Sequence, residues 1–465
     1  MALLDILQQL REQYYANPYP QAAERKAQLR ALRQQLLAQQ AELYSAAAID
    51  FGQRSASETR MLEVLPTVNN ISDAISKLGR WMKPSKRHVS ILFQPASNQV
   101  VYQPLGVVGV IVPWNYPIFL ALGPLVGAVA AGNKVMVKLS ESTPALNKVL
   151  KQIIETALPN IAIVVEGEAD VAAEFSALPF DHLLYTGSTA VGHHVMRAAS
   201  AHLTPVTLEL GGKSPVLLAP DANIKVMASR IMFGKACNGG QTCVAPDYLL
   251  VPAMSLTSTV EALTNEFQEF YPNGAADANW TSVINERHWQ RLCKLLQEAQ
   301  AAGAEIISLA GEVDFADSKR RMPIQVVINA PAHCAIWQEE IFGPLLPIKT
   351  YENINEAFDF IRSQPRPLAF YLFTDDKALQ KKSLEIVHAG GVCINDTLVH
   401  VGQDDLPFGG IGPSGMGHYH GREGFLTFSH AKAVHKKGRF NRGMFGYPHM
   451  RPKLLDKLLD WLLKP

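Results

Sequence analysis

The sequence predicts an α/β protein whose sheets are parallel and carry helices on both faces. Short apolar strands alternate with helical stretches along most of the chain, a pattern typical of parallel sheets. The 465 residues exceed one ordinary domain core, so we expect two or three lobes. Alternation of polar and apolar residues within 83–103 predicts a separate antiparallel arm.

The elements of the first lobe are predicted from the N-terminal half. Leucines at helical spacing indicate two outer helices within residues 3–50, and a further helical pattern covers 57–82. In the arm, Val89, Ile91 and Phe93 alternate with polar neighbours and predict a strand. Further strands are predicted over 107–112, 134–139, 161–165, 180–186 and 206–210.

Residues 105–131 form the most apolar stretch, and its length alone is compatible with a membrane span. Three prolines and Asn115 interrupt it, which argues against a span. We therefore interpret it as a buried strand that ends before Pro113, a turn, and a packed helix after Pro117.

The second half repeats the alternation and predicts a second α/β lobe. Strands are predicted over 215–218, 324–328, 370–374 and 391–395, with helices over 257–270, 286–302 and 376–389. Residues 407–417 contain too many glycines and prolines for regular structure and predict a functional loop. Leucines on one face of 453–464 predict a C-terminal amphipathic helix.

Charge and cysteine content narrow the class of function. The net charge of +1 provides no global field that would draw the chain to nucleic acid or to an acidic membrane. The five cysteines include no C-x-x-C pair, which argues against a disulfide framework or a zinc site. Residues 1–40 lack the pattern of a secretory signal. We expect small-molecule chemistry in a reducing, cytoplasmic compartment.

Candidate catalytic side chains lie in three separate segments. Cys243 follows two glycines in a bend that can bring a thiol close to a ligand, although a lone cysteine more often has a structural role. Glu209 ends an apolar strand, where a carboxyl is either a group with a raised pKa or a paired or solvent-facing acid. Asn115, between two prolines, is either a rigid amide donor or a turn residue.

Two further positions are compatible with nucleotide binding. Gly187 and Ser188 precede a helix whose N-terminal amides either bind a phosphate or are simply capped, since the G-x-G-x-x-G pattern is absent. Lys138 ends a strand and Glu141 follows it, so this pair either hydrogen-bonds ribose hydroxyls or is solvated surface charge. Taken singly, none of these positions decides the function.

Taken together, the segments form an ordered set of motifs. They read P-W-N-Y-P at 113–117, V-T-L-E-L-G-G-K at 206–213, G-Q-T-C at 240–243, E-E-I-F-G-P at 339–344 and P-F-G-G-I-G-P-S-G at 407–415. In this order and spacing they resemble the aldehyde dehydrogenase superfamily over about residues 20–435. The sequence of 204–215 and of 240–248 looks most like the class 3 and fatty or coniferyl aldehyde branch.

The resemblance implies two Rossmann-like lobes with a small β oligomerisation arm, and NAD(P)-dependent oxidation of a hydrophobic aldehyde to the acid. The aldehyde would be aliphatic, aromatic or polyene. Cys243 would form the thiohemiacetal and the thioester, with the Asn115 amide and the Cys243 N–H holding the alkoxide. Glu209 would activate water. A coenzyme A-acylating dehydrogenase and a non-enzymatic descendant are the alternatives.

The resemblance also assigns a cofactor site and implies no metal. Its residues are Trp114, Lys138, Glu141, Gly187, Ser188, Glu340 and Phe342. Lys138 and Glu141 would hold the adenosine ribose, and Glu340 and Phe342 the nicotinamide ribose and ring. A carboxylate at position 141 would repel a 2′-phosphate, so NAD is favoured, although relatives of this class often accept NADP.

The expected domain organisation follows from the same resemblance. Residues 1–82 and 104–210 would bind the cofactor, 211–400 would be catalytic, and 83–103 with 401–435 would bridge two subunits of a homodimer. The tail, 436–465, carries the amphipathic helix, which is too short for a membrane span. This helix would pack on its own or the partner subunit, cap the substrate entrance, or contact a membrane peripherally.

Overall fold

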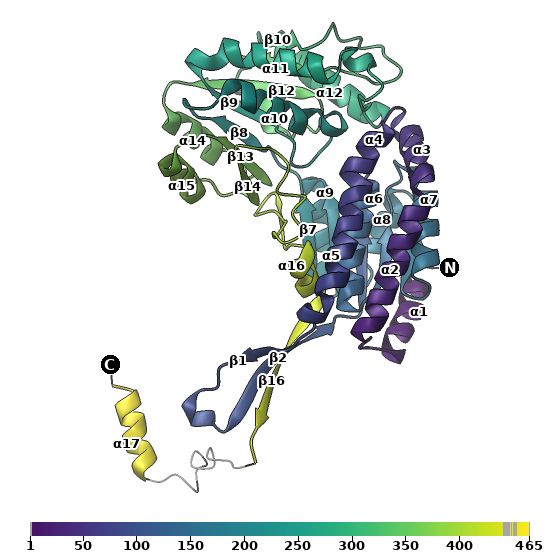
Figure 1. The fold of residues 1–465 in the computed structure, drawn as a ribbon, viewed down its shortest axis with the longest axis vertical. Coiled ribbons are helices and arrows are strands. Elements are labelled where there is room, and N and C mark those ends of the chain that lie inside the picture. The colour runs from purple at the N-terminus through teal and green to yellow at the C-terminus, as the bar shows by residue number, and fades with distance from the viewer. Residues whose placement is uncertain (1, 440–446, 448, 450–452, 465) are drawn as a thin grey trace.

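Two helix-covered sheets and a projecting arm make up the molecule (Figure 1). The structure is a computed structural model that describes residues 2–439, 447, 449 and 453–464. Both larger sheets are parallel except for one edge strand each, so the predicted α/β class is confirmed. Among the described residues, no helix combines the length and the apolar character needed to cross a membrane.

The first sheet has the strand order β15-β7-β6-β3-β4-β5, with β15 antiparallel to β7. Its strands are β3 (Val107–Ile111), β4 (Lys134–Lys138), β5 (Ala162–Val165), β6 (His182–Gly187), β7 (Val206–Leu210) and β15 (Gly415–Met416). The predicted reading of 105–131 is confirmed, because β3 is followed by a turn and by the helix α6 (Pro117–Ala131).

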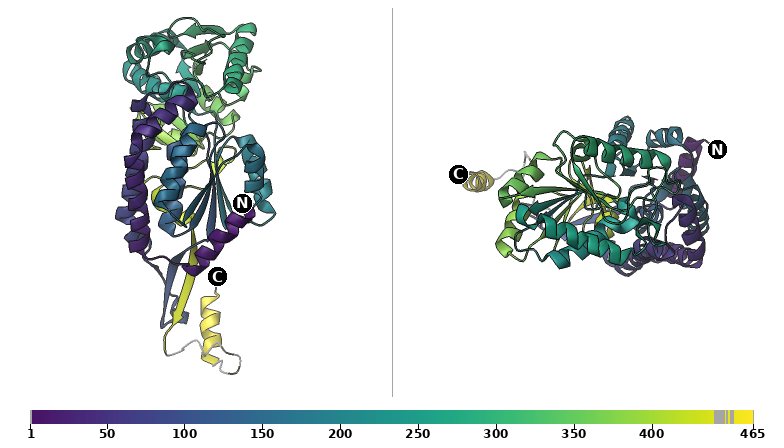
Figure 2. Two further views of the ribbon diagram at one scale, coloured as in Figure 1. Left: turned by 90° about the vertical axis from the view of Figure 1, so that its right-hand side faces the viewer. Right: turned by 90° about the horizontal axis from the view of Figure 1, so that it is seen from above.

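Helices cover both faces of this sheet, as Figure 2 shows. Successive residues of a strand face opposite sides, and in β3 and β4 both sets are buried. One face packs on α1 (Leu3–Ala16), α8 (Ala169–Ser176) and α9 (Thr189–Ser200). The other packs on α2 (Ala22–Ala38), α5 (Leu65–Trp81), α6 and α7 (Pro144–Ala157). Burial on both faces explains why these strands are continuous apolar runs rather than alternating ones.

The second sheet has the order β10-β11-β12-β9-β8-β13-β14, with β10 antiparallel. Its strands are β8 (Pro215–Leu218), β9 (Tyr248–Pro252), β10 (Glu305–Ser308), β11 (Gln325–Ile328), β12 (Leu345–Tyr351), β13 (Ala369–Phe373) and β14 (Gly391–Ile394). Its lobe also contains α10 (Ile224–Ala236), α11 (Leu256–Phe270), α12 (Glu286–Ala301), α13 (Ala335–Gln338), α14 (Ile354–Ser363), α15 (Lys377–Ile386) and the 3₁₀ turns η3 (Cys237–Gly240), η4 (Ala253–Ser255) and η5 (Gly274–Ala276).

The arm is an antiparallel sheet of β1 (Ser85–Arg87), β2 (Ala96–Pro104) and β16 (Ser429–Lys437). The strand predicted from Val89, Ile91 and Phe93 is wrong, because residues 91–93 form the 3₁₀ turn η2 (Ile91–Phe93). Phe93 N donates to Ser90 O at 2.9 Å, and β2 begins only after Pro95, which has no N–H for a ladder. Alternation of apolar and polar residues over only five positions fits a short strand and a 3₁₀ turn equally well.

The outer helices number three rather than the predicted two. After α1 and α2, the chain breaks at Gln39 (φ −108°, ψ 24°) and continues as α3 (Gln40–Phe51). No proline or glycine marks this break, so the sequence carried no signal for it. The predicted helical stretch 57–82 is divided into α4 (Ala56–Thr59), the π-helical turn η1 (Arg60–Val64) and α5.

The C-terminal segments return to the first lobe and then leave it. Residues 407–417, predicted to lack regular structure, contribute the two-residue strand β15. Gly415 pairs with Glu209, and a Cβ there would lie 2.0 Å from Leu208 O, so only glycine allows this approach. The helix α16 (Gly421–Thr427) follows, and the predicted amphipathic helix is present as α17 (Lys453–Leu462) beside the arm (Figure 1).

Candidate active site

Cys243 lies in a turn between η3 and β9 whose backbone is tightly packed. Asn238, Gly239 and Gly240 have φ values of 53°, 60° and 78°, so three consecutive residues are left-handed. A Cβ at Gly240 would lie 2.4 Å from Gly343 O. All five cysteines are described and free; four are buried, and only Cys243 is partly exposed. This exposure distinguishes Cys243 from a packing cysteine.

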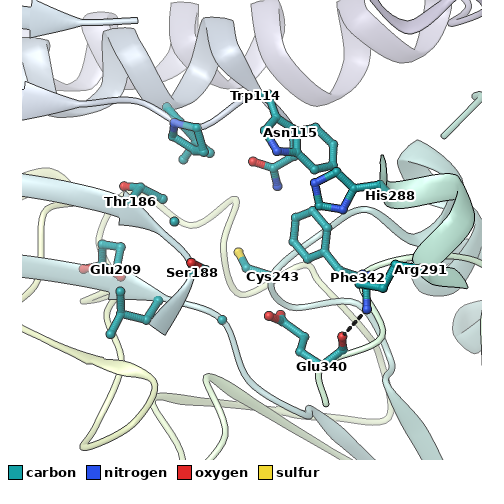
Figure 3. Close-up of a pocket in the computed structure, with 15 residues that line it drawn as sticks. Trp114, Asn115, Thr186, Ser188, Glu209, Cys243, His288, Arg291, Glu340 and Phe342 are labelled. Carbon is teal, nitrogen blue, oxygen red and sulfur yellow. Dashed lines mark hydrogen bonds between the residues drawn. The ribbon is translucent and has the colours of Figure 1, made fainter. Parts of the chain in front are cut away.

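Two pockets meet at this thiol, and Cys243 and Leu120 line both of them. The first, drawn in Figure 3, is lined by Pro113, Trp114, Asn115, Leu120, Thr186, Gly187, Ser188, Glu209, Leu210, Gly211, Cys243, His288, Arg291, Glu340 and Phe342. It therefore brings together eight of the ten residues predicted for catalysis and cofactor binding. Lys138 and Glu141 are not among its lining residues.

The second pocket is largely apolar. Its lining residues are Met61, Leu62, Pro66, Tyr116, Phe119, Leu120, Phe233, Thr242, Cys243, Val244, Leu398, Val399, Val401, Gly402, Phe408 and Tyr419. The hydroxyls of Tyr116 and Thr242 are hydrogen-bonded to each other at 2.7 Å. An apolar ligand in this pocket would lie against the thiol that also lines the first pocket.

Asn115 is 3% exposed, and its side-chain amide faces the Cys243 sulfur (Figure 3). The amide nitrogen donates to Gln241 O at 3.1 Å, which leaves its second hydrogen free for a ligand. Asn238 Nδ2 donates to the carbonyls of Asn115 and Gln241, at 2.9 and 3.1 Å. Asn115 is therefore held by two residues of the segment that leads to Cys243, Gln241 at its side-chain amide and Asn238 at its backbone carbonyl.

Glu209, near the end of β7, lines the same pocket and is 3% exposed. Both of its carboxyl oxygens are buried without a hydrogen-bond partner. Burial raises the pKa of Glu209 well above its usual range. Because Glu209 is buried and neither oxygen has a partner, it is neither a paired nor a solvent-facing acid. The interpretation that remains is a carboxyl with a raised pKa, since burying an unpartnered charge is costly.

Burial and the neighbouring carboxyls disfavour ionisation of the Cys243 thiol. Burial, and after it the carboxyls of Glu340 and Glu209, raise the pKa of Cys243 to about 12, while the backbone N–H groups of Cys243 and Val244 lower it. The thiol is therefore protonated at neutral pH in this form of the protein, and its reaction as a nucleophile requires a proton acceptor.

Glu340 and Phe342 occupy the segment between α13 and β12. Burial, with Asp247 as the next contribution, raises the pKa of Glu340 to about 8. A Cβ on Gly211 would lie 2.1 Å from Glu340 Oε2, so the carboxyl rests directly on this glycine. Phe342 has a φ of 47° and its ring packs edge-on against Trp114 at 5.3 Å.

Gly187 and Ser188 lie where β6 ends and α9 begins. The Ser188 hydroxyl caps the helix by accepting from Val191 N at 3.4 Å. The N-terminus of α9 therefore borders the pocket, and its partial positive charge favours an anion there. Lys138 Nζ donates to the carbonyls of Leu139 and Gly167, at 2.8 and 2.7 Å, and Glu141 is exposed nearby.

Several pocket residues were not predicted from sequence. Arg291 on α12 donates to Glu340 O at 3.1 Å (Figure 3) and also to Ile341 O. The ring of His288 lies 5.0 Å from that of Trp114. Thr186 contributes a buried hydroxyl without a partner. Arg291 and His288 come from a helix whose sequence shows only amphipathic spacing, so no sequence signal distinguished them.

Fold and site together define an α/β enzyme in which a thiol lies between an apolar pocket and a pocket suited to a nucleotide. The chain belongs to the aldehyde dehydrogenase family, whose model matches residues 12–434. It is therefore an oxidoreductase that oxidises aldehydes and uses NAD(P), and the predicted class 3-like resemblance is confirmed.

Individual relatives support this assignment over the full chain. A protein named "Probable coniferyl aldehyde dehydrogenase" from Pseudomonas aeruginosa is 52% identical over 439 residues, covering 94% of this chain and 91% of the relative. The substrate-bound structure of Staphylococcus aureus AldH matches with a TM-score of 0.93 at 36% identity, with 100% of both chains covered. The NAD⁺ complex of a Mycobacterium tuberculosis aldehyde dehydrogenase matches with a TM-score of 0.83 at 26% identity. The match covers 92% of this chain and 88% of the other.

Proposed function

We propose that this enzyme oxidises hydrophobic aldehydes, either aliphatic of medium or long chain, aromatic or polyene, to carboxylic acids. The observation that carries the proposal is the position of Cys243, between a pocket with apolar walls and one bordered by a helix N-terminus. The apolar pocket would take the aldehyde's hydrocarbon part. The name of the P. aeruginosa relative, a coniferyl aldehyde dehydrogenase, supports an aromatic substrate.

Cys243 would lose its thiol proton to solvent, and the sulfur would attack the aldehyde carbon; the C–S bond forms as the carbonyl π bond opens and places negative charge on the oxygen. The free hydrogen of the Asn115 amide and the Cys243 N–H would donate to this oxygen. Because Gln241 O and Asn238 hold Asn115 in place, its donor is oriented before the charge develops. Loss of the hydride then gives a thioester on Cys243.

The first pocket fits a nicotinamide dinucleotide by the chemistry of its lining. The N-terminus of α9 would bind the pyrophosphate through Gly187 and Ser188, and the Glu340 carboxyl would accept from ribose hydroxyls. Trp114 and Phe342 supply flat apolar faces for the ring. When bound, NAD(P)⁺ supplies the acceptor for the hydride. Lys138 and exposed Glu141 would hold the second ribose, where the Glu141 charge favours NAD over NADP.

Glu209 would take a proton from water as that water attacks the thioester carbonyl, which releases the acid and regenerates the thiol. The two carboxyl oxygens without partners support this role, since both remain available to bind water. A carboxyl so placed favours hydrolysis over transfer of the acyl group to coenzyme A.

Two substitutions test the assignment. Cys243→Ala should abolish turnover. Glu209→Gln should leave a first turnover, seen as a burst of reduced cofactor, followed by a steady state slower by about 10²-fold or more, because general base catalysis contributes on that scale. In the unaltered enzyme, hydrolysis should rise with pH as Glu209 ionises through its raised pKa.

The controls for these variants are turnover with added coenzyme A and binding of NAD⁺. Neither variant should bind NAD⁺ more weakly by more than a few-fold. Turnover by Cys243→Ala, a Glu209→Gln variant with full steady-state rate, or a requirement for coenzyme A would each contradict the proposed chemistry.

We also propose a domain organisation and an assembly. Residues 1–82 and 104–210 would bind the cofactor and 211–400 would be catalytic, with 83–103 and 401–435 bridging the subunits of a homodimer. The arm projects from the first lobe, away from the second, which supports a bridging role (Figure 1). Five free cysteines support a reducing, cytoplasmic location. The exposed apolar face of α17 would contact a partner subunit or a membrane surface peripherally.

A further inference from the structure

A buried ion pair lies behind the loop that carries Asn115. Arg54 Nη1 is 3.0 Å from Glu63 Oε1, and neither side chain is exposed. Arg54 precedes α4, and Glu63 belongs to the π-helical turn η1. Burying two charges is expensive, and the sequence motifs that identified the site do not include either residue.

Glu63 holds the N-terminus of α6. Its Oε2 accepts from Ile118 N at 2.7 Å and from Phe119 N at 3.2 Å. These are among the first N–H groups of the helix, which have no partner within it. The carboxylate also complements the positive end of the helix dipole. The helix start, only two residues beyond Asn115, is thereby fixed in place.

Arg54 holds the Asn115 residue itself. Its Nη1 donates to Asn115 O at 3.3 Å, and its guanidinium lies over the rings of Phe51 and Tyr116, at 4.6 and 5.3 Å. Asn238 donates to the same carbonyl from the thiol loop. The backbone of Asn115 is therefore held from the N-terminal segment as well as from the loop that carries Cys243.

We propose that Arg54 and Glu63 are positioning residues that set the direction of the Asn115 amide toward the oxygen of the aldehyde. This inference rests on the proposed role of Asn115. Neither side chain lines the pockets or touches the reacting atoms. They act through the Asn115 carbonyl and the start of α6, where a small displacement misaligns the donor with the developing charge.

The same turn connects this pair to the substrate pocket. Met61 and Leu62, the two residues before Glu63, line the apolar pocket. Loss of the pair would release the turn η1 at the point where these side chains meet the aldehyde. The effect on the KM for the aldehyde should therefore exceed the effect on the KM for NAD⁺, whose site lies across the first pocket.

A double-mutant cycle tests the inference through hydride transfer, measured as the pre-steady-state formation of reduced cofactor. Asn115→Ala and Glu63→Gln should each slow this step, by about 10²-fold for Asn115→Ala, the scale for one oxyanion donor, and about tenfold for Glu63→Gln. The double variant should be no slower than Asn115→Ala alone, because Glu63 then has no donor left to orient.

The outcomes separate this inference from the function on which it rests. If Asn115→Ala retains full rate, the proposed role of Asn115 is wrong. If Asn115→Ala is slow but Glu63→Gln retains full rate, or if their effects multiply in the double variant, the positioning role is wrong and the function stands.

Arg25→Met is the matched control for lost stability. Arg25 is also buried, and it donates to Ala130 O and Ala131 O, at 3.0 and 2.6 Å, at the opposite end of α6. Its loss should lower the Tm without slowing hydride transfer. A slowing equal to that of Glu63→Gln would indicate general damage to α6 and overturn the proposal.

Arg54→Lys provides a second route if Glu63→Gln does not fold. Lysine keeps the charge opposite Glu63 but lacks the planar guanidinium that lies over Phe51 and Tyr116 while its Nη1 contacts both Glu63 and the Asn115 carbonyl. The Arg54→Lys variant should slow hydride transfer. Combining it with Asn115→Ala should cause no slowing beyond that of Asn115→Ala alone. Alkylation of Cys243 by iodoacetamide, which develops no oxyanion, should proceed at the parent rate in Arg54→Lys, and a parallel loss of alkylation would count against a role specific to Asn115.

Discussion

At the scale of single residues, the site is a thiol surrounded by carboxyls. Glu340 and Glu209 both raise the pKa of Cys243, and they belong to different lobes. Because burial disfavours the thiolate, and each carboxyl disfavours it further once ionised, the resting thiol stays protonated and is protected from adventitious alkylation and oxidation.

Glu340→Gln tests this electrostatic coupling. Above its pKa of about 8, Glu340 is ionised and repels the thiolate; the amide removes this charge and lowers the pKa of Cys243. Alkylation by iodoacetamide at pH 9 should therefore be faster in the variant, by up to about tenfold, since one pKa unit changes the thiolate fraction tenfold. The rate is measured by mass spectrometry of the adduct.

The pH dependence supplies the decisive comparison. Below pH 8 Glu340 is protonated, so the parent and the variant should converge. Glu339→Gln, a neighbouring exposed acid, is the control and should behave like the parent. Slower alkylation of Glu340→Gln at pH 9 would show that Glu340 accepts the thiol proton instead of opposing its loss.

At the scale of elements, the connection from β7 to β8 lies against Glu340 of the proposed cofactor site. Gly211 leaves room for the Glu340 carboxyl, which arrives from the segment before β12 in the other lobe. The sequence showed two glycines, Gly211 and Gly212, after the predicted strand 206–210. It could not show which side chain would fill the space, because that contact joins residues far apart in the chain.

Gly211→Ala tests this contact. The new Cβ would lie 2.1 Å from Glu340 Oε2, so the flexible end of Glu340 must move away from its position. The KM for NAD⁺ should rise about tenfold, equivalent to about 1.4 kcal/mol of binding free energy. Gly79→Ala is the matched control, because a Cβ there meets no atom within 4 Å. An unchanged KM in Gly211→Ala would contradict the placement of Glu340.

At the scale of the whole molecule, the arm and α17 lie apart from the two lobes (Figure 1). The helix exposes Leu458, Leu459 and Trp461 by 41%, 38% and 67%. Packing against its own lobes, one of the sequence-based expectations, is therefore wrong. In the arm, Ile91 and Phe93 are 83% and 57% exposed. Exposed apolar side chains in a turn of this projecting arm favour association with a second chain.

Ile91→Asp combined with Phe93→Asp tests the arm as a dimer contact. Two apolar side chains that become buried on association contribute about 1.5–3 kcal/mol each, so the dimer Kd should rise at least 100-fold. Sedimentation equilibrium measures it. Ile49→Asp, at a residue 71% exposed on α3, is the control and should not change the Kd. A double variant with the parent Kd would remove the arm from the interface.

The sequence alone determined the α/β class, the family and the identity of Cys243, Glu209 and Asn115 as candidate catalytic groups. These rest on local patterns: apolar runs set the buried strands, and glycines and prolines set the turns that carry the motifs. The sequence failed where a local pattern fits two structures, as at the break after α2 and in the turn at residues 91–93.

Only the tertiary structure decided which residues meet. It placed Cys243 between two pockets, left Glu209 without a partner, and set Arg54 and Glu63 behind Asn115. It also left Lys138 and Glu141 outside the lining of the pocket that holds the other predicted residues. Burial, and with it the pKa of each carboxyl and thiol, depends on side chains from distant segments, so it follows from packing and cannot be read from local sequence.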